Sequence, residues 1–243
     1  MKALISLAHD AEQIFLDLNR AVSGPLTLFG VDGKNLSAWQ YFVYGVSGRR
    51  WPLTPGEVGC SLSHLAALRE FLASNDQVLT VYEADAFVRD EFCEPESIFK
   101  LYEERPIVLH LGGHEGVLRR SRLFGKVVCD MPGVKVWELS RYSTRWLFRT
   151  CGYMVNREAA AIIAKAYQRR LQRADDWGKL LQGRQCVFLY AHMVSHPLHL
   201  NDSLLQSERS QLHRPSLIHR FGARLRGALT LFCLKLSGNS RIP

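Results

Sequence analysis

Glu83 and Asp85 flank Ala84 directly after an apolar run that ends at Tyr82. In an extended chain, residues two positions apart point to the same side, so these two carboxylates are expected to lie together. Such a pair repels unless water solvates it or a cation lies between its members. Hard divalent cations such as Mn²⁺ and Mg²⁺ bind carboxylate oxygens together with phosphate oxygens of a substrate. The pair therefore predicts either a metal site for a diphosphate-bearing substrate or a solvated loop after a strand.

Three histidines near the C-terminal third are a second candidate for metal binding. His192 and His196 have the i, i+4 spacing of a helical zinc site, and His199 follows them. The run lacks the glutamate of the HExxH motif, and Pro197 interrupts any helix there. We expect no zinc centre from these residues, although a single one of them would serve as an extra ligand for a metal or phosphate.

Arginines gather in the middle of the chain and are a third candidate. Guanidinium groups bind phosphate oxygens in pairs, so arginines that border a pocket would hold phosphate groups of a substrate. The alternative is a solvated helix or loop face. The residues concerned are Arg119, Arg120, Arg122, Arg141, Arg145 and Arg149.

Alternating strands and helices are expected to position these residues. Apolar runs predict strands at 2–7, 26–33, 77–88, 107–113, 134–140, 151–156 and 185–190, and helical spacing predicts helices at 11–22, 59–73 and 157–172. Pro52, Pro55 and Gly56 are expected to exclude regular structure just before the second helix. This succession predicts an α/β fold with a mostly parallel sheet, in which ligands bind at the carboxyl ends of the strands.

The positive charge of the chain is unevenly distributed. Of 31 basic residues, six arginines and one lysine lie in residues 209–243, which contain no acid, and this leaves 24 bases against 23 acids in residues 1–208. A nearly neutral body argues against a nucleic-acid-binding protein, whose binding face is basic. A basic end instead favours a local contact with an anionic surface.

The basic end also has the pattern of an amphipathic helix. Its apolar residues follow Pro215 at a spacing that forms one helical stripe, with arginine and lysine beside or opposite the stripe. Such a helix can lie in the headgroup region of an anionic membrane. Packing on the body of the protein and formation of a homodimer are the alternatives.

The cysteines and the first residues indicate the compartment. No two of the six cysteines lie within four residues of each other, so the sequence has no CxxC metal or redox motif. The first ten residues already include Asp10 and have no apolar core of the length of a signal peptide. No run approaches the roughly 18 apolar residues that span a bilayer. We expect a reduced, cytoplasmic protein.

Residues 53–88 resemble the signature region of glycosyltransferase family 25, the bacterial lipopolysaccharide and lipooligosaccharide transferases related to collagen galactosyltransferases. That region has a Gly-Glu-Ile-Gly-Cys segment, a Ser-His pair on the next helix, and a strand ending in Glu-Asp-Asp. Weaker similarity extends over most of residues 1–205. The matching residues in this sequence are Gly56, Glu57, Val58, Gly59, Cys60, Ser63, His64, Glu83 and Asp85.

The resemblance implies a GT-A-like fold: a Rossmann-type nucleotide-binding half joined to an acceptor half within residues 1–208, followed by the basic tail at 209–243. It implies inverting transfer of a hexose, with UDP-galactose the leading donor, to the lipopolysaccharide or lipooligosaccharide core. Mn²⁺ or Mg²⁺ would bind at Glu83 and Asp85. The donor-binding residues implied are Ser6, Leu7, Asp32, Glu57, Gly59, Ser63, His64, Glu83 and Asp85.

The resemblance also places Asp175 and Asp176 on the acceptor side of the pocket. An inverting transfer needs a base that takes the proton of the acceptor hydroxyl, and either aspartate would supply it. Helix capping or hydrogen bonding to the acceptor is the alternative role. The acceptor itself would be a lipid-linked oligosaccharide, reached by peripheral association with the inner face of the cytoplasmic membrane.

One departure from the family pattern affects the expected metal site. Ala84 stands where the family usually has an aspartate, so the site has one carboxylate fewer. Metal binding would then be weaker, or the transfer would be independent of metal. A non-catalytic nucleotide-sugar-binding or scaffolding member of the family is the alternative function.

Overall fold

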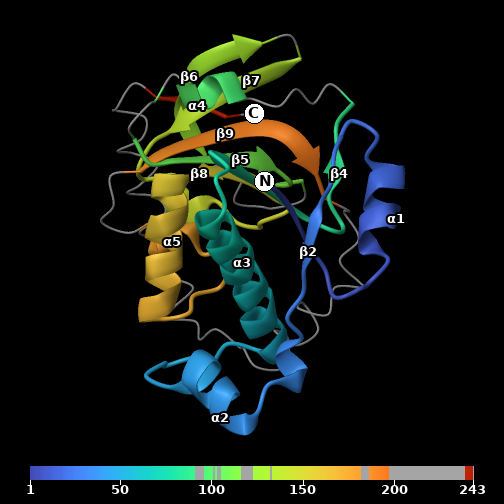
Figure 1. Cartoon of the computed structure of the whole chain (residues 1–243). Coiled ribbons are helices and arrows are strands. Elements are labelled where there is room, and N and C mark those ends of the chain that lie inside the picture. Colours follow the sequence, from blue (N-terminus) through green and yellow to red (C-terminus); the bar gives the residue numbers. More distant parts are fainter. Residues whose placement is uncertain are drawn as a thin grey trace.

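The computed structural model describes residues 1–90, 96–100, 102, 105–115, 123–131, 133–181, 186–196 and 239–242. These residues form one ten-stranded sheet, ordered β10-β6-β7-β9-β5-β8-β3-β1-β2, with β4 paired to β9 (Figure 1). The strands are β1 Lys2–Ile5, β2 Thr27–Phe29, β3 Val78–Glu83, β4 Phe87–Val88, β5 Ile107–Gly112, β6 Phe124–Met131, β7 Val134–Leu139, β8 Gly152–Asn156, β9 Val187–Ser195 and β10 Ser240–Arg241.

Most strands of the sheet point in one direction. β1 pairs in parallel with β2 and with β3, and β5 pairs in parallel with β9. β8 lies antiparallel between β3 and β5, and β7 lies antiparallel between β9 and β6. Consequently β1, β2, β3, β5, β6 and β9 share a direction, although most neighbouring pairs in the described sheet are antiparallel. The expected α/β class with strands mostly in one direction is confirmed.

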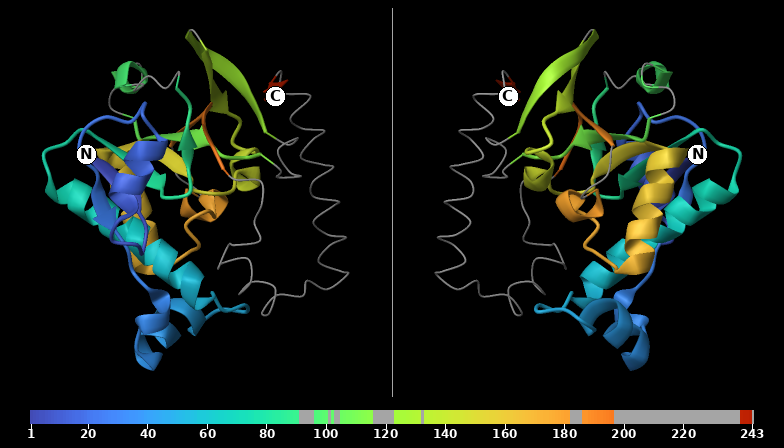
Figure 2. Two further views of the ribbon diagram at one scale, coloured as in Figure 1. Left: turned by 90° about the vertical axis from the view of Figure 1, so that its right-hand side faces the viewer. Right: turned by 90° about the vertical axis from the view of Figure 1, so that its left-hand side faces the viewer.

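Helices cover both faces of this sheet (Figures 1 and 2). Helices α3 Pro55–Ala73 and α5 Arg157–Arg169 pack on one face, whereas α1 Ala11–Leu18 and α4 Glu96–Lys100 pack on the other. Side chains along β1 alternate between the two faces. Ala3 and Ile5 belong to the hydrophobic cluster that contains Leu68 of α3, while Leu4 belongs to the cluster that contains Phe15 of α1. Successive side chains of a strand point to opposite faces, so β1 fills both layers.

Helix α3 begins four residues earlier than the sequence predicts. The hydroxyl of Thr54 accepts a hydrogen bond from the Glu57 backbone N–H, and the Glu57 carboxylate accepts one from the Thr54 backbone N–H. This capping box fixes the start of the helix. Pro55 suits the first helical position because a backbone N–H there would have no partner within the helix, so the N–H that proline lacks is not needed. The expectation that Pro55 and Gly56 exclude regular structure was therefore wrong.

Further elements were not expected from the sequence. Helix α2, Ala38–Tyr41, begins at a second capping box, between Ser37 and Gln40, and continues into a π-helical turn, η2, Phe42–Val46. Strands β6 and β10 and the short helix α6, Trp177–Leu180, were also missed. β10 with two residues and α6 with four are too short for a hydrophobic period to show, whereas the eight residues of β6, FGKVVCDM, lack a regular alternation of apolar and polar residues.

Several sequence predictions lie outside the described residues, namely those for Arg119, Arg120, Arg122, His199 and the tail apart from residues 239–242. None of the described helices is long and apolar enough to cross a bilayer. The four cysteines in the described part of the chain, Cys60, Cys129, Cys151 and Cys186, are free thiols.

Candidate functional site

The strand directions bring distant parts of the chain to one edge of the sheet. The carboxyl ends of β1, β2, β3, β5 and β9 meet at this edge, because these strands share one direction. The antiparallel strand β8 starts at the same edge, so the residues just before it lie there as well. In open α/β sheets this is the edge at which ligands bind.

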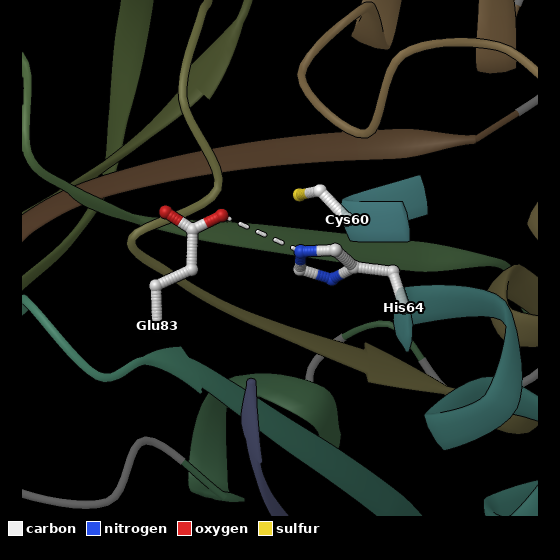
Figure 3. Close-up of side chains that lie close together, drawn as sticks. All are labelled: Cys60, His64 and Glu83. Carbon is white, nitrogen blue, oxygen red and sulfur yellow. Dashed lines mark hydrogen bonds and ion pairs between the residues drawn. The ribbon is translucent and has the colours of Figure 1, made fainter. Parts of the chain in front are cut away.

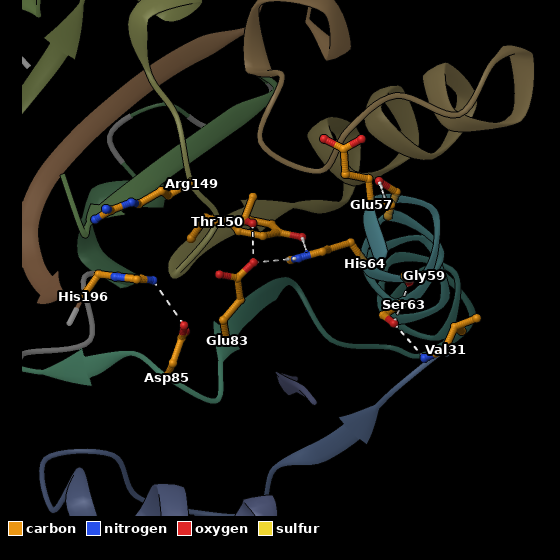
Figure 4. A network of polar contacts seen from close by, with 12 residues as sticks. Val31, Glu57, Gly59, Ser63, His64, Glu83, Asp85, Arg149, Thr150 and His196 are labelled. Carbon is orange, nitrogen blue, oxygen red and sulfur yellow. Dashed lines mark hydrogen bonds and ion pairs between the residues drawn. The ribbon is translucent and has the colours of Figure 1, made fainter. Parts of the chain in front are cut away.

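Glu83 ends β3 at the centre of this edge (Figure 4). Its Oε1 accepts hydrogen bonds from the Thr150 hydroxyl at 2.5 Å and from Nε2 of His64 at 3.4 Å. The other nitrogen of His64, Nδ1, lies 3.1 Å from the Tyr153 hydroxyl. Because the carboxylate only accepts, Nε2 carries the imidazole proton and the tyrosine hydroxyl donates to Nδ1. Glu83 is thus held in place, while 22% of its side chain remains exposed.

Cys60 lies one helical turn before His64 on α3 and completes a cluster with Glu83 (Figure 3). The thiol sulfur, an imidazole nitrogen and a carboxylate oxygen lie within 4.8 Å of one another. Figure 3 also shows that the second carboxylate oxygen of Glu83 points away from His64. Thiolate, imidazole and carboxylate together are the ligand types of zinc and similar ions.

The sequence suggested that Asp85 and Glu83 share one face of an extended strand, but in the structure they do not. The chain turns after Glu83, and the Ala86 backbone N–H donates to the Glu83 carbonyl at 2.9 Å. Asp85 instead reaches His196, whose Nε2 lies 3.1 Å from Oδ2 of the aspartate (Figure 4). With 56% of its side chain exposed, Asp85 is the more open of the two acids. The two carboxylates therefore border one site from different sides.

Arg149 precedes β8 in a backbone conformation that is unusual for a side-chain-bearing residue, with φ of 66°. Its carbonyl accepts hydrogen bonds from Nε2 of His110 at 3.0 Å and from Nε1 of Trp177 at 3.1 Å. Its guanidinium donates to the carbonyls of Gly113 and Glu115. The left-handed conformation costs about 1–2 kcal/mol, and these contacts compensate for it. They place Thr150 against Glu83 (Figure 4).

Buried titratable groups underlie this site. Burial lowers the pKa of His110 to about 4, even though its hydrogen bond to the Arg149 carbonyl acts in the opposite direction. The Gly112 backbone N–H donates to Nδ1 of His110, which agrees with a neutral ring that is protonated at Nε2. Burial also raises the pKa of Cys151 well above its usual range, and the negative charges of Glu83 and Asp85 raise it further. The negative charges of Glu83 and Asp85 therefore both affect the Cys151 thiol.

Several residues expected to contact the donor have structural contacts instead. The Ser63 hydroxyl donates to the Gly59 carbonyl and accepts from the Val31 backbone N–H, so it fixes the end of β2 to α3. A Cβ on Gly59 would lie 2.4 Å from the Val31 carbonyl oxygen, which explains the glycine. Asp32 caps the 3-10 turn Gly33–Asn35 by accepting from the Lys34 backbone N–H.

The remaining residues expected to bind the donor lie directly after β1 and at the start of α3. The Ser6 hydroxyl accepts from the Ala8 backbone N–H, and 56% of Leu7 is exposed directly after β1. The Glu57 carboxylate is buried at the start of α3, where its Oε1 lies 3.9 Å from the Arg173 guanidinium. Of the residues named from the sequence, Glu83, Asp85 and His64 form the polar centre, whereas Glu57 belongs to a neighbouring group around Arg173.

Asp175 and Asp176 lie in that neighbouring group. Asp175 is 3.9 Å from the Arg173 guanidinium. Asp176 is 3.9 Å from the same guanidinium and 2.6 Å from Nζ of Lys179. Although Asp176 precedes α6, its side chain forms no capping hydrogen bond there. Trp177 follows the aspartates and packs against Tyr153, so the group is joined to the Glu83 network through aromatic contacts.

The histidines expected from the sequence separate into two pairs with acids. Nε2 of His192 lies 2.5 Å from the Glu115 carboxylate, and Nδ1 lies 3.3 Å from the Arg89 guanidinium. His196 pairs with Asp85 instead. The hydrogen bond from His192 lowers the pKa of Glu115, although burial alone would raise it. Within the described residues, His192 and His196 therefore contact two different acids, Glu115 and Asp85.

Of the expected arginines in the described part of the chain, Arg149 has contacts at the centre of the site. Arg141 stacks on Tyr142, and Arg145 lies over the ring of Trp146. Thr150, Tyr153 and the pairing of His196 with Asp85 were not expected from the sequence. Thr150 directly precedes the predicted strand at 151–156 and Tyr153 lies within it, so proximity to the start of this strand was the available signal.

A model of glycosyltransferase family 25, described as LPS biosynthesis protein, matches residues 31–177. This range contains Cys60, His64, Glu83, Asp85 and Thr150. A search of curated protein sequences found no match.

Solved structures gave weak similarities. A197 from STIV is 10% identical with a TM-score of 0.42, covering 79% of this chain and 81% of that chain. A putative glucose-1-phosphate thymidylyltransferase from Bacillus anthracis is 11% identical with a TM-score of 0.39, covering 89% of this chain and 77% of that chain. The galactosyltransferase LgtC, in complex with donor and acceptor sugar analogs, is 8% identical with a TM-score of 0.35, covering 77% of this chain and 73% of that chain. Scores this low carry no functional assignment.

Proposed function

Because this chain belongs to glycosyltransferase family 25, we propose that it transfers a hexose, with inversion, from a UDP-sugar to a lipopolysaccharide or lipooligosaccharide core. UDP-galactose is the leading donor. The family match makes the chain a glycosyltransferase, and the donor, acceptor and stereochemistry are the proposed part. The observation that carries the proposal is the position of Glu83, which ends a central parallel strand, is fixed by Thr150 and His64, and keeps part of its carboxylate exposed.

The residues around Glu83 fit a divalent cation. Glu83 and Asp85 offer carboxylate oxygens, the ligands that suit Mn²⁺ or Mg²⁺. When bound, the cation would offset the negative charge that develops on the departing diphosphate. Thr150 and His64 would orient Glu83, and the Arg149 guanidinium would add positive charge on the same side. Loss of the middle acid at Ala84 is then compatible with metal binding.

Glu83 is also shared with a second set of ligand atoms. Cys60, His64 and Glu83, whose ligand atoms lie within 4.8 Å of one another, suit a thiophilic ion such as Zn²⁺, whereas the carboxylates of Glu83 and Asp85 suit a hard ion. The two sets have Glu83 in common, so occupation of one changes the ligands left for the other. We propose the hard set for the donor diphosphate because Asp85 is the more exposed acid.

Asp175 is the better candidate for the base of the two aspartates. Inversion requires a group that accepts the proton of the attacking hydroxyl. The Asp176 carboxylate is held by the Lys179 ammonium at 2.6 Å and by the Arg173 guanidinium at 3.9 Å, whereas Asp175 lies 3.9 Å from Arg173. An ammonium in direct contact with Asp176 occupies the place from which this carboxylate would meet the acceptor hydroxyl.

The acceptor is proposed to be a lipid-linked oligosaccharide at the cytoplasmic face of the inner membrane. A lipid-linked acceptor requires the enzyme to approach a bilayer, and the basic residues of 209–243 would provide an electrostatic contact with anionic lipid. Ser6, Leu7, Asp32, Glu57, Gly59 and Ser63 are proposed to shape the donor pocket, chiefly through the backbone positions that their contacts fix.

A donor screen tests this function. Purified protein is incubated with Mn²⁺ and UDP-galactose, UDP-glucose or their N-acetyl forms, with truncated lipooligosaccharide as acceptor, and UDP release and product mass are measured. We expect transfer from one donor, and a loss of at least 100-fold in the variants Glu83→Gln and Asp85→Asn. Asp130→Asn, an exposed acid on β6, is the matched control and should keep full activity.

The same proteins separate an enzyme from a scaffold. Calorimetry with UDP and Mn²⁺ should show metal-dependent binding that Glu83→Gln weakens. Binding without transfer to any acceptor would favour a non-catalytic family member, and no binding and no transfer would refute the proposed donor site.

A further inference from the structure

Residues 33–56, from the 3-10 turn after β2 to the first two residues of α3, form a projection at one end of the molecule (Figures 1 and 2). These 24 residues contain five aromatic residues, one lysine and two arginines, and no acidic residue. Elsewhere in residues 1–208 acids and bases nearly balance. The composition of this projection is therefore distinct from that of the body around it.

Large apolar side chains of the projection point into solvent. Trp39 is 71% exposed, Trp51 is 53% exposed, and Phe42 is 45% exposed. The rings of Trp39 and Phe42 stack at a centroid distance of 5.8 Å, and the Arg50 guanidinium lies 5.7 Å from the centroid of Trp51. Val43 and Tyr44 are also exposed. We refer to Trp39, Phe42, Val43, Tyr44 and Trp51 as the aromatic face.

The aromatic face is held by a well-anchored backbone. The Tyr41 hydroxyl donates to the Leu53 carbonyl at 2.7 Å, and the Leu53 backbone N–H donates to the Gly45 carbonyl at 2.9 Å. A Cβ on Gly45 would lie 2.9 Å from the Tyr41 ring, so the turn packs closely at this point.

Two arginines fix the same projection to the body. The Arg49 guanidinium donates to the carbonyls of Tyr44 and Leu171, and that of Arg170 donates to the Gly48 carbonyl. The exposure of the aromatic face is thus a property of an ordered surface, because these hydrogen bonds fix its backbone to the body.

We propose that the aromatic face docks on the headgroup region of an anionic lipid bilayer. Tryptophan and tyrosine favour this region because their rings are apolar and their polar atoms remain hydrated. Soluble proteins seldom expose adjacent apolar side chains unless these bind a partner. The exposed Lys34 and Arg50 give the projection a positive charge with no acid in residues 33–56, which complements anionic headgroups and makes a lipid surface the preferred partner.

The position of the projection relates it to the candidate site. It follows the carboxyl end of β2, and β2 is parallel to β1, which is parallel to β3, so the projection leaves the sheet at the edge where Glu83 lies. Docking there would bring this edge toward the bilayer that contains a lipid-linked acceptor. The consequence for the acceptor rests on the proposed function, but the docking itself does not, and it is measured without donor or acceptor.

Tryptophan fluorescence tests the docking directly. The protein has five tryptophans; Trp137, Trp146 and Trp177 are at most 8% exposed, and residues 209–243 contain none. The full chain is mixed with vesicles of phosphatidylethanolamine and phosphatidylglycerol that contain a phosphatidylcholine brominated near the headgroup. Docking predicts quenching of the emission from Trp39 and Trp51, whereas contact through the tail alone leaves the emission unquenched.

Variants separate the contributions of ring and charge. Trp39→Phe with Trp51→Phe should abolish quenching while vesicle binding in a flotation assay persists. Trp39→Ser with Trp51→Ser should weaken binding at least tenfold, and Arg50→Gln should weaken it about fivefold, the effect of one charge near an anionic surface. Leu18→Ser, a 59% exposed leucine on α1, is the matched control and should bind like the parent.

Three results would overturn the proposal. The first is unquenched emission in vesicles that nevertheless bind the protein. The second is that a delipidated core oligosaccharide, added without vesicles, binds the protein and shields the emission of Trp39 and Trp51 from quenching. This result would assign the aromatic face to sugar stacking. The third is a dimer in light scattering that Trp39→Ser with Trp51→Ser dissociates, which would assign the face to a second copy of the chain.

Discussion

Replacement of Thr150 by valine tests whether the hydrogen bond to Glu83 positions a metal ligand. Valine keeps the shape of threonine and removes its hydroxyl, which lies 2.5 Å from Oε1 of Glu83. Thr150 is 3% exposed, so water cannot easily take the place of this donor. A hydrogen bond to a charged group contributes about 1.5–3 kcal/mol, and loss of such a contact behind a metal ligand lowers metal affinity about 10- to 100-fold.

The expected effect is on the metal dependence of the reaction. UDP release is measured at saturating donor over a range of Mn²⁺ concentrations, and the concentration that gives half-maximal activity should rise about 10- to 100-fold in Thr150→Val. The rate at saturating Mn²⁺ should fall much less, because Glu83 itself remains. Thr80→Val is the control: this threonine is 5% exposed, lies within β3 and is three residues from Glu83.

An unchanged Mn²⁺ dependence in Thr150→Val would refute this reasoning, because Glu83 would then either bind no metal or need no support from Thr150. Equal shifts in Thr150→Val and Thr80→Val would also refute it, since they would indicate a general loss of packing. Circular dichroism and thermal unfolding show whether both variants are folded.

Three further predictions follow from the site. Zn²⁺ should inhibit the parent at least tenfold more strongly than it inhibits Cys60→Ser, measured as UDP release with Mn²⁺ present, because the thiolate completes a thiophilic set around the shared glutamate; equal inhibition would contradict this. Asp175→Asn should lower kcat by about 10²- to 10⁴-fold, the usual contribution of a general base, and Asp176→Asn by far less; the reverse order would identify Asp176 as the base. Burial lowers the pKa of His110 to about 4 in the folded protein, whereas in the unfolded chain this histidine takes up a proton near pH 6.5. Its contribution to the free energy of unfolding is therefore complete above pH 6.5 and falls by about 2 kcal/mol between pH 7 and pH 5. Urea unfolding at both pH values should show a smaller loss in His110→Gln, and an equal loss would contradict the assignment.

The elements that carry the site were largely predictable from the sequence. The five-residue run Val78–Tyr82 before Glu83 predicted β3, and the long helical period around Leu65 and Leu68 predicted most of α3. Such patterns are strong because burial of one face or of both faces imposes a period on the residues. The position of Glu83 at the ligand-binding edge followed from the α/β class alone.

Contacts between distant segments were not predictable in the same way. Thr150 and Tyr153 reach Glu83 and His64 because β8 runs antiparallel beside β3, and no local pattern gives the direction or the neighbour of a strand. Asp85 was expected beside Glu83 on an extended chain, but a turn at Ala84 and Asp85 sends it to His196. Periodicity describes regular elements, whereas the site depends on the residues just after those elements end.

The start of α3 and the aromatic projection show a related limit. Proline and glycine at 52–56 suggested irregular structure, but Thr54 and Glu57 together cap a helix whose first residue is Pro55. The four residues of α2 were too few for a helical period to show, although Ser37 and Gln40 have the spacing of a capping box. Caps were the more informative signals at both places.

A crystal grown with UDP and Mn²⁺ gives the most direct test of the central claim, that the acids at the end of β3 bind a cation which contacts the donor diphosphate. Anomalous scattering at the manganese edge should give one peak within coordination distance of the Glu83 and Asp85 carboxylates and of the UDP phosphates. A peak elsewhere, or UDP bound at this edge with both carboxylates turned away from it, would contradict the account.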